Sequence, residues 1–118
     1  MKCLILCAML GSALALPAAA QQSWVAIADD GRDLYGLGVG MATRGAAEGM
    51  AVGTCGVPCQ VRLAAVARCV AYARSDPGDA SGYAAGADLE TVRQMAWEAC
   101  NRRVPSNSCR IRAARCIE

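Results

Sequence analysis

The sequence predicts an α+β fold in which two copies of a strand-strand-helix-strand unit form an antiparallel sheet packed by two helices. Three observations lead to this prediction. The chain matches itself after a shift of 45 residues, short apolar runs are separated by turn residues, and six cysteines follow the first apolar segment. Strands interrupted by single helices are typical of the α+β class, and we expect disulfides to stabilise this one.

The internal repeat defines the organisation of the chain, because self-similarity at a fixed period indicates repeated supersecondary units. We expect one domain over 21–118, with the two copies at about 24–66 and 69–116. Within the glycine-containing stretches, the 45-residue shift places Gly38 on Tyr83 and Gly40 on Ala85. The other matches are Val25–Ala28 with Val70–Ala73, Met50–Ala51 with Met95–Ala96, Cys55 with Cys100 and, after a five-residue insertion, Cys59–Arg62 with Cys109–Arg112.

Each copy begins with two strands. The first strands are short apolar runs, and a turn follows each at Asp29-Asp30-Gly31 and at Ser75-Asp76-Pro77-Gly78. The second strands are rich in glycine, which favours the close approach of a packed helix. The predicted ranges are Trp24–Ala28 and Val70–Ala73 for the first strands, and Tyr35–Gly40 and Ser81–Gly86 for the second.

A helix and a closing strand complete each copy. Thr43 and Asp88 are equivalent in the repeat, and both residue types cap helix starts. The helices are expected to run to about Thr54 and Ala99, and the closing strands cover Cys59–Val66 and Cys109–Ala114. The residues expected on the buried helix faces are Ala47, Met50, Ala51 and Cys55, with Val92, Met95, Ala96 and Cys100 in the second copy.

The first twenty residues predict a secretory signal peptide. Lys2 precedes the apolar run Cys3–Leu16, Pro17 ends it, and Ala18–Ala20 offers small residues for cleavage before Gln21. The run is shorter than the roughly 20 residues that span a bilayer, so we expect no membrane span after cleavage. The predicted location is therefore the periplasm or the extracellular space, and 98 residues remain for one domain.

Six cysteines in a short exported chain predict a disulfide framework, for which fifteen pairings exist. The repeat makes Cys55–Cys59 equivalent to Cys100–Cys109, which leaves Cys69 for Cys116. The alternative is a zinc site built from Cys55, Cys59, Cys100 and Cys109. Its spacings differ from the usual C-x2-C, and an oxidising compartment removes free thiolates. We therefore expect disulfides and neither a metal nor a cofactor.

Several function classes are disfavoured. The spacing of Gly40 and Gly45 resembles a phosphate-binding loop, but Ala46 and Ala47 stand where that loop requires Lys and Ser/Thr. The net charge is only +2, which argues against nucleic acid as a partner. The chain has no histidine, the commonest general base, so no catalytic residue is assigned. Asp29 and Asp30 are a carboxylate pair that a hydrolase could use, but their residue type and position predict a turn.

At this point the sequence resembles a known family. The run WVAIA, a YGxG-type strand, an alanine-rich helix ending in cysteine, and C-x-V-x together are similar to the exported bacterial family catalogued as domain of unknown function 4189. The similarity covers about residues 24–118. It implies a small secreted or envelope protein, and it implies no established activity and no catalytic residues.

The remaining candidates form a hypothetical partner surface. Gly45, Gly49 and Gly53 recur every four residues and so share one helix face, which is predicted to point outward and could contact a second copy of the chain. Trp97 is a candidate binding anchor or a cover for the core rim. Arg62, Arg110 and Arg112 could hold an acidic partner or form a solvated sheet face.

The function hypothesis is an exported module that binds an unidentified protein, as an inhibitor or immunity-like protein of the cell envelope. The alternatives are a secreted effector or matrix protein that contacts host or neighbouring cells, and a small carboxylate-dependent envelope hydrolase.

Overall fold

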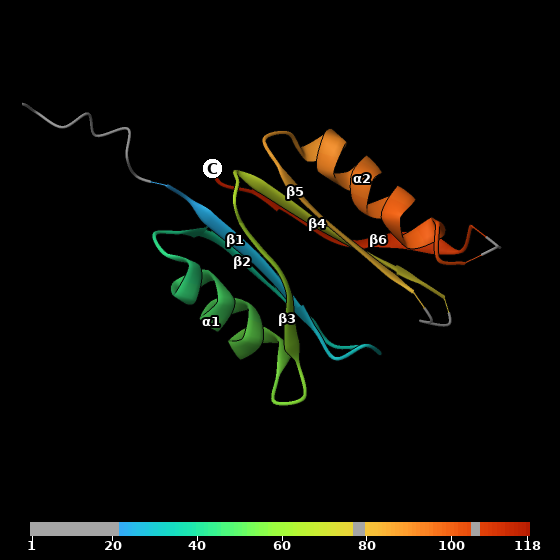
Figure 1. Cartoon of the computed structure of the whole chain (residues 1–118), viewed down its shortest axis with the longest axis horizontal. Coiled ribbons are helices and arrows are strands. Elements are labelled where there is room, and N and C mark those ends of the chain that lie inside the picture. The colour runs from blue at the N-terminus through green and yellow to red at the C-terminus, as the bar shows by residue number, and fades with distance from the viewer. Residues whose placement is uncertain (1–21, 77–79, 105–106) are drawn as a thin grey trace, which may run out of the picture.

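The computed structural model describes residues 22–76, 80–104 and 107–118, and it consists of two strand-strand-helix-strand units in succession (Figure 1). The α+β class and its stabilisation by disulfides are confirmed. The predicted signal peptide lies outside the described residues. The first unit contains β1 (Trp24–Asp29), β2 (Tyr35–Met41), α1 (Arg44–Cys55) and β3 (Gln60–Val66), and the second contains β4 (Cys69–Ser75), β5 (Ser81–Gly86), α2 (Leu89–Asn101) and β6 (Cys109–Cys116).

Each unit forms its own three-stranded antiparallel sheet, with strand orders β2-β1-β3 and β5-β4-β6. The sequence led us to expect one antiparallel sheet. The central strands explain the difference, because β1 and β4 each pair on both sides with strands of their own unit. No strand of one unit is needed to complete the other, and the short connection through Ala67 and Arg68 leads from the first sheet to the second.

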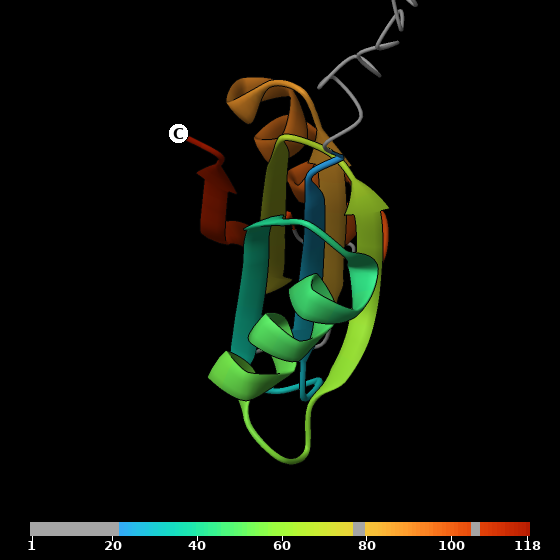
Figure 2. The same ribbon diagram turned by 90° about the vertical axis from the view of Figure 1, so that its left-hand side faces the viewer.

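The two sheets pack face to face, and the helices cover their outer faces: α1 the first sheet, α2 the second (Figures 1 and 2). Residues of β1 and β4 are therefore buried on both faces, and they alternate. Ala26 and Ala71 point toward the helices. Ile27 and Tyr72 point into the layer between the sheets, which holds the larger side chains.

The predicted close approach of a helix to the glycine-rich strands is confirmed. A Cβ atom on Gly82 would overlap the carbonyl oxygen of Ala96 and lie 2.6 Å from the backbone nitrogen of Cys100. Gly36 meets α1 in the same way, where a Cβ atom would lie 2.8 Å from the backbone nitrogen of Cys55. Only a residue without a side chain lets the helix backbones come this near.

The pairing also corrects the alignment of the second strands. Gly36 lies opposite Ala28, and Gly82 lies opposite Ala73, the equivalent of Ala28. From Tyr35 to Gly38 the two strands therefore correspond at a shift of 46 residues, and the bulge opposite Trp24–Ala26 restores the shift of 45 at Met41. Structural equivalents are Leu37 with Tyr83 and Gly38 with Ala84, in place of Gly38 with Tyr83.

Both predicted helix caps are present. The Thr43 hydroxyl accepts from the backbone N–H of Ala46, and the Asp88 carboxylate accepts from that of Thr91. After α1, Gly56 adopts a φ of 122° and donates its N–H to the carbonyl of Val52. Such positive φ angles favour glycine at helix ends.

The buried helix faces are narrower than predicted. Met50 and Met95 are 42% and 47% exposed, so their assignment to the core is wrong. The helices lie so close to their sheets that only a stripe with a four-residue spacing is covered. Gly45, Gly49 and Gly53 face open space, as predicted. The buried residues are Ala47, Ala51 and Cys55 in α1, and Val92, Ala96 and Cys100 in α2.

Three disulfides join the pairs that the repeat predicted. Cys55–Cys59 and Cys100–Cys109 each tie the end of a helix to the strand that follows it. Cys69–Cys116 links the start of β4 to the end of β6, where the two residues are register partners. These bonds use all four thiols of the alternative zinc site.

Candidate functional site

A buried carboxylate lies between the two sheets. Asp29, the last residue of β1, is 1% exposed. Its oxygens accept hydrogen bonds from Arg62 Nε at 2.7 Å, from the Tyr83 hydroxyl at 2.9 Å and from the Tyr72 hydroxyl at 3.0 Å. The interpretation of Asp29 as a turn residue is therefore wrong, because its side chain points inward to the second unit. It is right for Asp30, which accepts from the N–H groups of Arg32 and Leu34.

Arg74 meets Asp29 from the other sheet. It occupies the equivalent position at the end of β4, and its Nη1 lies 3.4 Å from Asp29 Oδ2. The same nitrogen donates to the Ser81 hydroxyl at 2.7 Å, and Nη2 donates to the Gly31 carbonyl oxygen. This buried ion pair thus joins the ends of the two central strands.

The surroundings keep Asp29 ionised. Burial alone would raise the pKa of its carboxyl, but the hydrogen bonds from Arg62, Tyr83 and Tyr72 outweigh burial and hold the pKa below its usual 3.8. Burial and the hydrogen bond to Asp29 raise the pKa of Tyr83 to about 12. At neutral pH the Asp29 carboxyl is therefore ionised and the Tyr83 hydroxyl is protonated.

A β-bulge in each closing strand, β3 and β6, directs one arginine toward the end of the central strand. The register of β3 on β1 shifts between Leu63 and Val61, and that of β6 on β4 shifts between Ala113 and Ile111. Each shift leaves one arginine outside the ladder, Arg62 in β3 and Arg112 in β6. Bulges re-aim side chains in this way, often beside functional sites. Arg62 is exposed as a residue, and its Nε reaches Asp29 within the chain.

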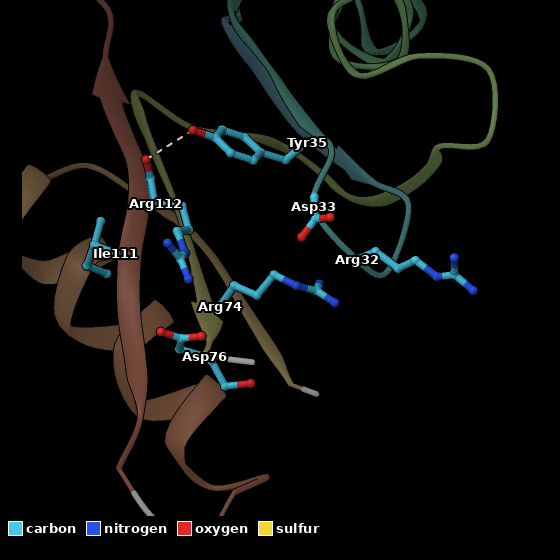
Figure 3. Close-up of a pocket in the computed structure, with 8 residues that line it drawn as sticks. Arg32, Asp33, Tyr35, Arg74, Asp76, Ile111 and Arg112 are labelled. Carbon is cyan, nitrogen blue, oxygen red and sulfur yellow. Dashed lines mark hydrogen bonds between the residues drawn. The ribbon is translucent and has the colours of Figure 1, made fainter. Parts of the chain in front are cut away.

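Arg112 instead borders a cavity of about 430 Å³. Figure 3 shows Asp33 and Tyr35 on one side, from the turn and start of β2, and Ile111 and Arg112 of β6 on the other. The Tyr35 hydroxyl donates to the Arg112 carbonyl oxygen at 3.3 Å. The remaining lining residues are Arg32, Arg74, Ser75 and Asp76.

The floor of this cavity is rigid and its rim is open. Arg74 and Ser75 are 6% and 1% exposed. Arg74 is held by the contacts described above, and the Ser75 hydroxyl accepts from the N–H of Ala80 at 2.8 Å. The ring centroids of Tyr35 and Tyr72 lie 5.1 Å apart, so the rim is continuous with the aromatic residues around Asp29. The arrangement can hold a polar ligand between this rigid floor and the exposed guanidinium group of Arg112.

The residues of the hypothetical partner surface do not form one surface. The glycine stripe lies on the outer side of α1, whereas Trp97 belongs to α2 on the opposite side of the molecule (Figure 1). Trp97 is 37% exposed, and its Nε1 donates to the Cys109 carbonyl oxygen at 3.1 Å. Arg110 is exposed and does not line the cavity. Of the residues predicted for the partner surface, only Arg62 and Arg112 lie near the ends of the central strands.

Sequence reasoning missed Arg74, Tyr72 and Tyr83. One signal was present, since the 45-residue shift that defines the repeat places Asp29 on Arg74. Opposite charges at equivalent positions suggest a contact between repeats, although nothing in the pattern shows that those positions face each other.

Two further observations bear on the class of site. In the described part of the chain, no group of three His, Cys, Asp or Glu residues is placed to hold a metal ion. Within those same residues, neither helix has the length and apolar character that a membrane crossing requires.

Fold and site together define a small α+β module linked by disulfides. The chain belongs to the family described as "Domain of unknown function (DUF4189)", which matches residues 24–116. No curated protein and no solved structure matches the chain.

Proposed function

We propose that this protein is an exported binding module that recognises a partner protein through the end of the molecule where β1 and β4 finish. We call this surface the strand-end face and define it by Arg32, Asp33, Leu34, Tyr35, Val57 and Arg112. The observation that carries the proposal is the charged cavity of about 430 Å³ with exposed apolar side chains beside it.

The apolar part of the strand-end face is Leu34 and Val57, which are 46% and 99% exposed. They lie near each other, because a Cβ atom on Gly56 would be 3.8 Å from Leu34 Cδ1. Val57 sits in the five-residue loop closed by the Cys55–Cys59 disulfide. A constrained loop loses little conformational entropy on binding, and apolar groups beside polar ones are typical of protein interfaces.

The same residues favour binding over catalysis. The carboxylate hydrolase would need Asp29 as an acid, base or nucleophile. Asp29 is instead buried and accepts hydrogen bonds from an arginine and two tyrosines. We place the module in the envelope as an inhibitor or immunity-like protein, since the signal-like first twenty residues and the disulfides both fit an oxidising compartment.

Site-specific photo-crosslinking in the native host tests the proposal. A photoreactive residue at Leu34 should give a discrete crosslinked partner, whereas the same residue at Met95, equally exposed on α2, should not. The purified partner should then bind Leu34→Ser at least about tenfold more weakly than Met95→Ser, because buried apolar anchors carry interface energy. Equal crosslinking from both positions, or equal binding by both variants, would refute the strand-end face.

Cell fractionation and intact mass in the same host test the compartment. The chain should begin at Gln21 and be found in the periplasm or the medium. Protein that retains Met1 in the cytoplasm would contradict export, and protein found mainly in the medium would favour the secreted-effector alternative.

A further inference from the structure

We propose that the cavity of the strand-end face binds a single carboxylate group, presented by an acidic side chain of the partner protein. This deepens the proposed function and rests on it for the source of the carboxylate. The site itself follows from comparing the two units at equivalent positions.

In the first unit, the bulge arginine of the closing strand meets a carboxylate at the end of the central strand, where Arg62 Nε lies 2.7 Å from Asp29 Oδ1. In the second unit, the bulge arginine is Arg112, but the central strand ends in Arg74. Among the residues that the structure describes, no carboxylate oxygen lies within 4.0 Å of the Arg112 guanidinium. The second unit therefore has the equivalent arginine beside a cavity, and the described carboxylates that line this cavity, Asp33 and Asp76, do not form an ion pair with it.

The charges around the cavity limit the charge of the ligand. The Asp29 cluster and the cavity lining contain four arginines and three aspartates, and Asp30, which interacts electrostatically with Arg74, brings these described charges into balance. Asp33 and Asp76 in the lining repel a dianion more strongly than a monoanion. The cavity is thus better suited to a carboxylate than to a phosphate dianion or a nucleic-acid backbone. The arginines counted are Arg32, Arg62, Arg74 and Arg112, and the aspartates are Asp29, Asp30, Asp33 and Asp76.

The geometry is prepared for this ligand. The planar guanidinium fork matches the two oxygens of a carboxylate. Arg112 is fixed at its backbone by the Tyr35 hydroxyl, and Arg74 is fixed on the floor by Asp29 and Ser81. The floor of the cavity and the backbone of Arg112 are therefore already in place, and binding has to order only the exposed Arg112 side chain.

The neighbouring apolar residues identify the source. A free carboxylic acid in the cavity would leave Leu34 and Val57 in water, whereas a protein segment bearing Asp or Glu can place apolar side chains on both. The exposed fractions of 46% and 99% therefore favour an acidic side chain with apolar neighbours.

NMR titration of the full mature chain tests the site. The probe is the blocked tripeptide acetyl-Leu-Glu-Leu-amide, and the controls are its Gln counterpart, acetate and inorganic phosphate. The Glu peptide should give saturable shifts at Tyr35, Ser75 and Arg112. We expect acetate to bind the same residues more weakly, and the Gln peptide and phosphate about tenfold more weakly or not at all, since hydrogen bonds to charged groups are worth about one to two powers of ten in Kd.

Matched variants locate the effect. Arg112→Gln should weaken Glu-peptide binding about tenfold. Arg110→Gln removes the same charge two residues away on β6, outside the cavity, and should change Kd by less than about twofold because exposed charges are screened. Asp33→Asn removes a repulsive neighbour and should tighten binding about three- to fivefold, the effect of one nearby charge at the surface. This gain cannot result from misfolding.

The failures are separable. Phosphate binding as tight as that of the Glu peptide, or equal loss in the Arg112 and Arg110 variants, would overturn the carboxylate site. Acetate binding as tight as that of the peptide would overturn the side-chain source. Saturable peptide binding without a crosslinked partner would refute the proposed function and leave the site standing. Crosslinking of a partner from Leu34, without NMR shifts on addition of the Glu peptide, would support the proposed function and refute the carboxylate site.

Discussion

Asp29→Asn is the most informative perturbation of the fold, because the structure predicts a large loss from a nearly isosteric change. Asp29 is 1% exposed and accepts hydrogen bonds from five side chains: Arg62, Arg74, Tyr72, Tyr83 and Ser81. In Asp29→Asn one acceptor oxygen becomes an NH2 group, which is itself a donor, and both arginines lose their counter-ion. Removing one partner of a buried ion pair costs about 3–5 kcal/mol. In a domain of this size, that lowers Tm by at least about 12 °C.

The matched control is Asp30→Asn, the same substitution one residue later. The Asp30 side chain is exposed, and its role is to accept from two backbone N–H groups. Asparagine keeps that acceptor, so the free energy of unfolding should change by less than about 0.5 kcal/mol. Thermal and denaturant unfolding of both variants at pH 7, with disulfides intact, give the comparison.

The pH dependence adds an independent signature. Because the pKa of Asp29 is lowered in the folded protein, the unfolded chain binds its proton at a higher pH. The stability that the carboxylate contributes is present above the unfolded pKa of about 3.9 and is lost as pH falls through the folded value. The difference between wild type and Asp29→Asn should therefore be constant from pH 5 to 8 and shrink below about pH 4. A loss below about 1 kcal/mol at pH 7, or an equal loss in Asp30→Asn, would refute the network.

Two other predictions concern the packing and the disulfides. Gly82→Ala should lower the free energy of unfolding by about 1–3 kcal/mol or more, since its Cβ would overlap α2. Gly49→Ala, on the open face of α1, should raise the free energy of unfolding by about 0.4–1 kcal/mol. Chemical denaturation measures both changes, and changes of the same sign would contradict the assigned faces. Replacing Cys69 and Cys116 by serine should cost about 4 kcal/mol and replacing Cys55 and Cys59 about 2 kcal/mol, because the bonded cysteines are 47 and 4 positions apart in the sequence. The reverse order of the urea midpoints would show that loop entropy does not dominate.

The local structure could be read from the sequence because it depends on local chemistry. Thr43 and Asp88 cap the helices through bonds to residues three positions away. The cysteine pairs follow from the repeat, and the glycines of β2 follow from the space that a helix needs. Each of these features is decided within one unit.

The predictions that failed depend on how strands, helices and sheets meet in three dimensions, which the sequence pattern does not specify. Asp29 and Asp30 are identical in type and adjacent, but only Asp29 ends a strand that faces another sheet. Arg62 and Arg112 leave the expected alternation because of bulges in their strands. Met50 falls outside the core because glycine in β2 brings α1 too close for a wider buried stripe. Such facts depend on how the units meet, and the repeat alone does not specify that.

The opposite charges of Asp29 and Arg74 have a consequence for how such a molecule can be assembled. A dimer of two identical halves would bring the end of each central strand to the same place and set Asp against Asp, or Arg against Arg, in a buried layer. Like charges in that position repel strongly. With both halves in one polypeptide, the two positions can differ, and symmetry at the interface is broken. The half that carries the aspartate then closes its own side with Arg62, while the half that carries the arginine is left with an open cavity. A single chain built from two similar halves thereby acquires one recognition site and not two.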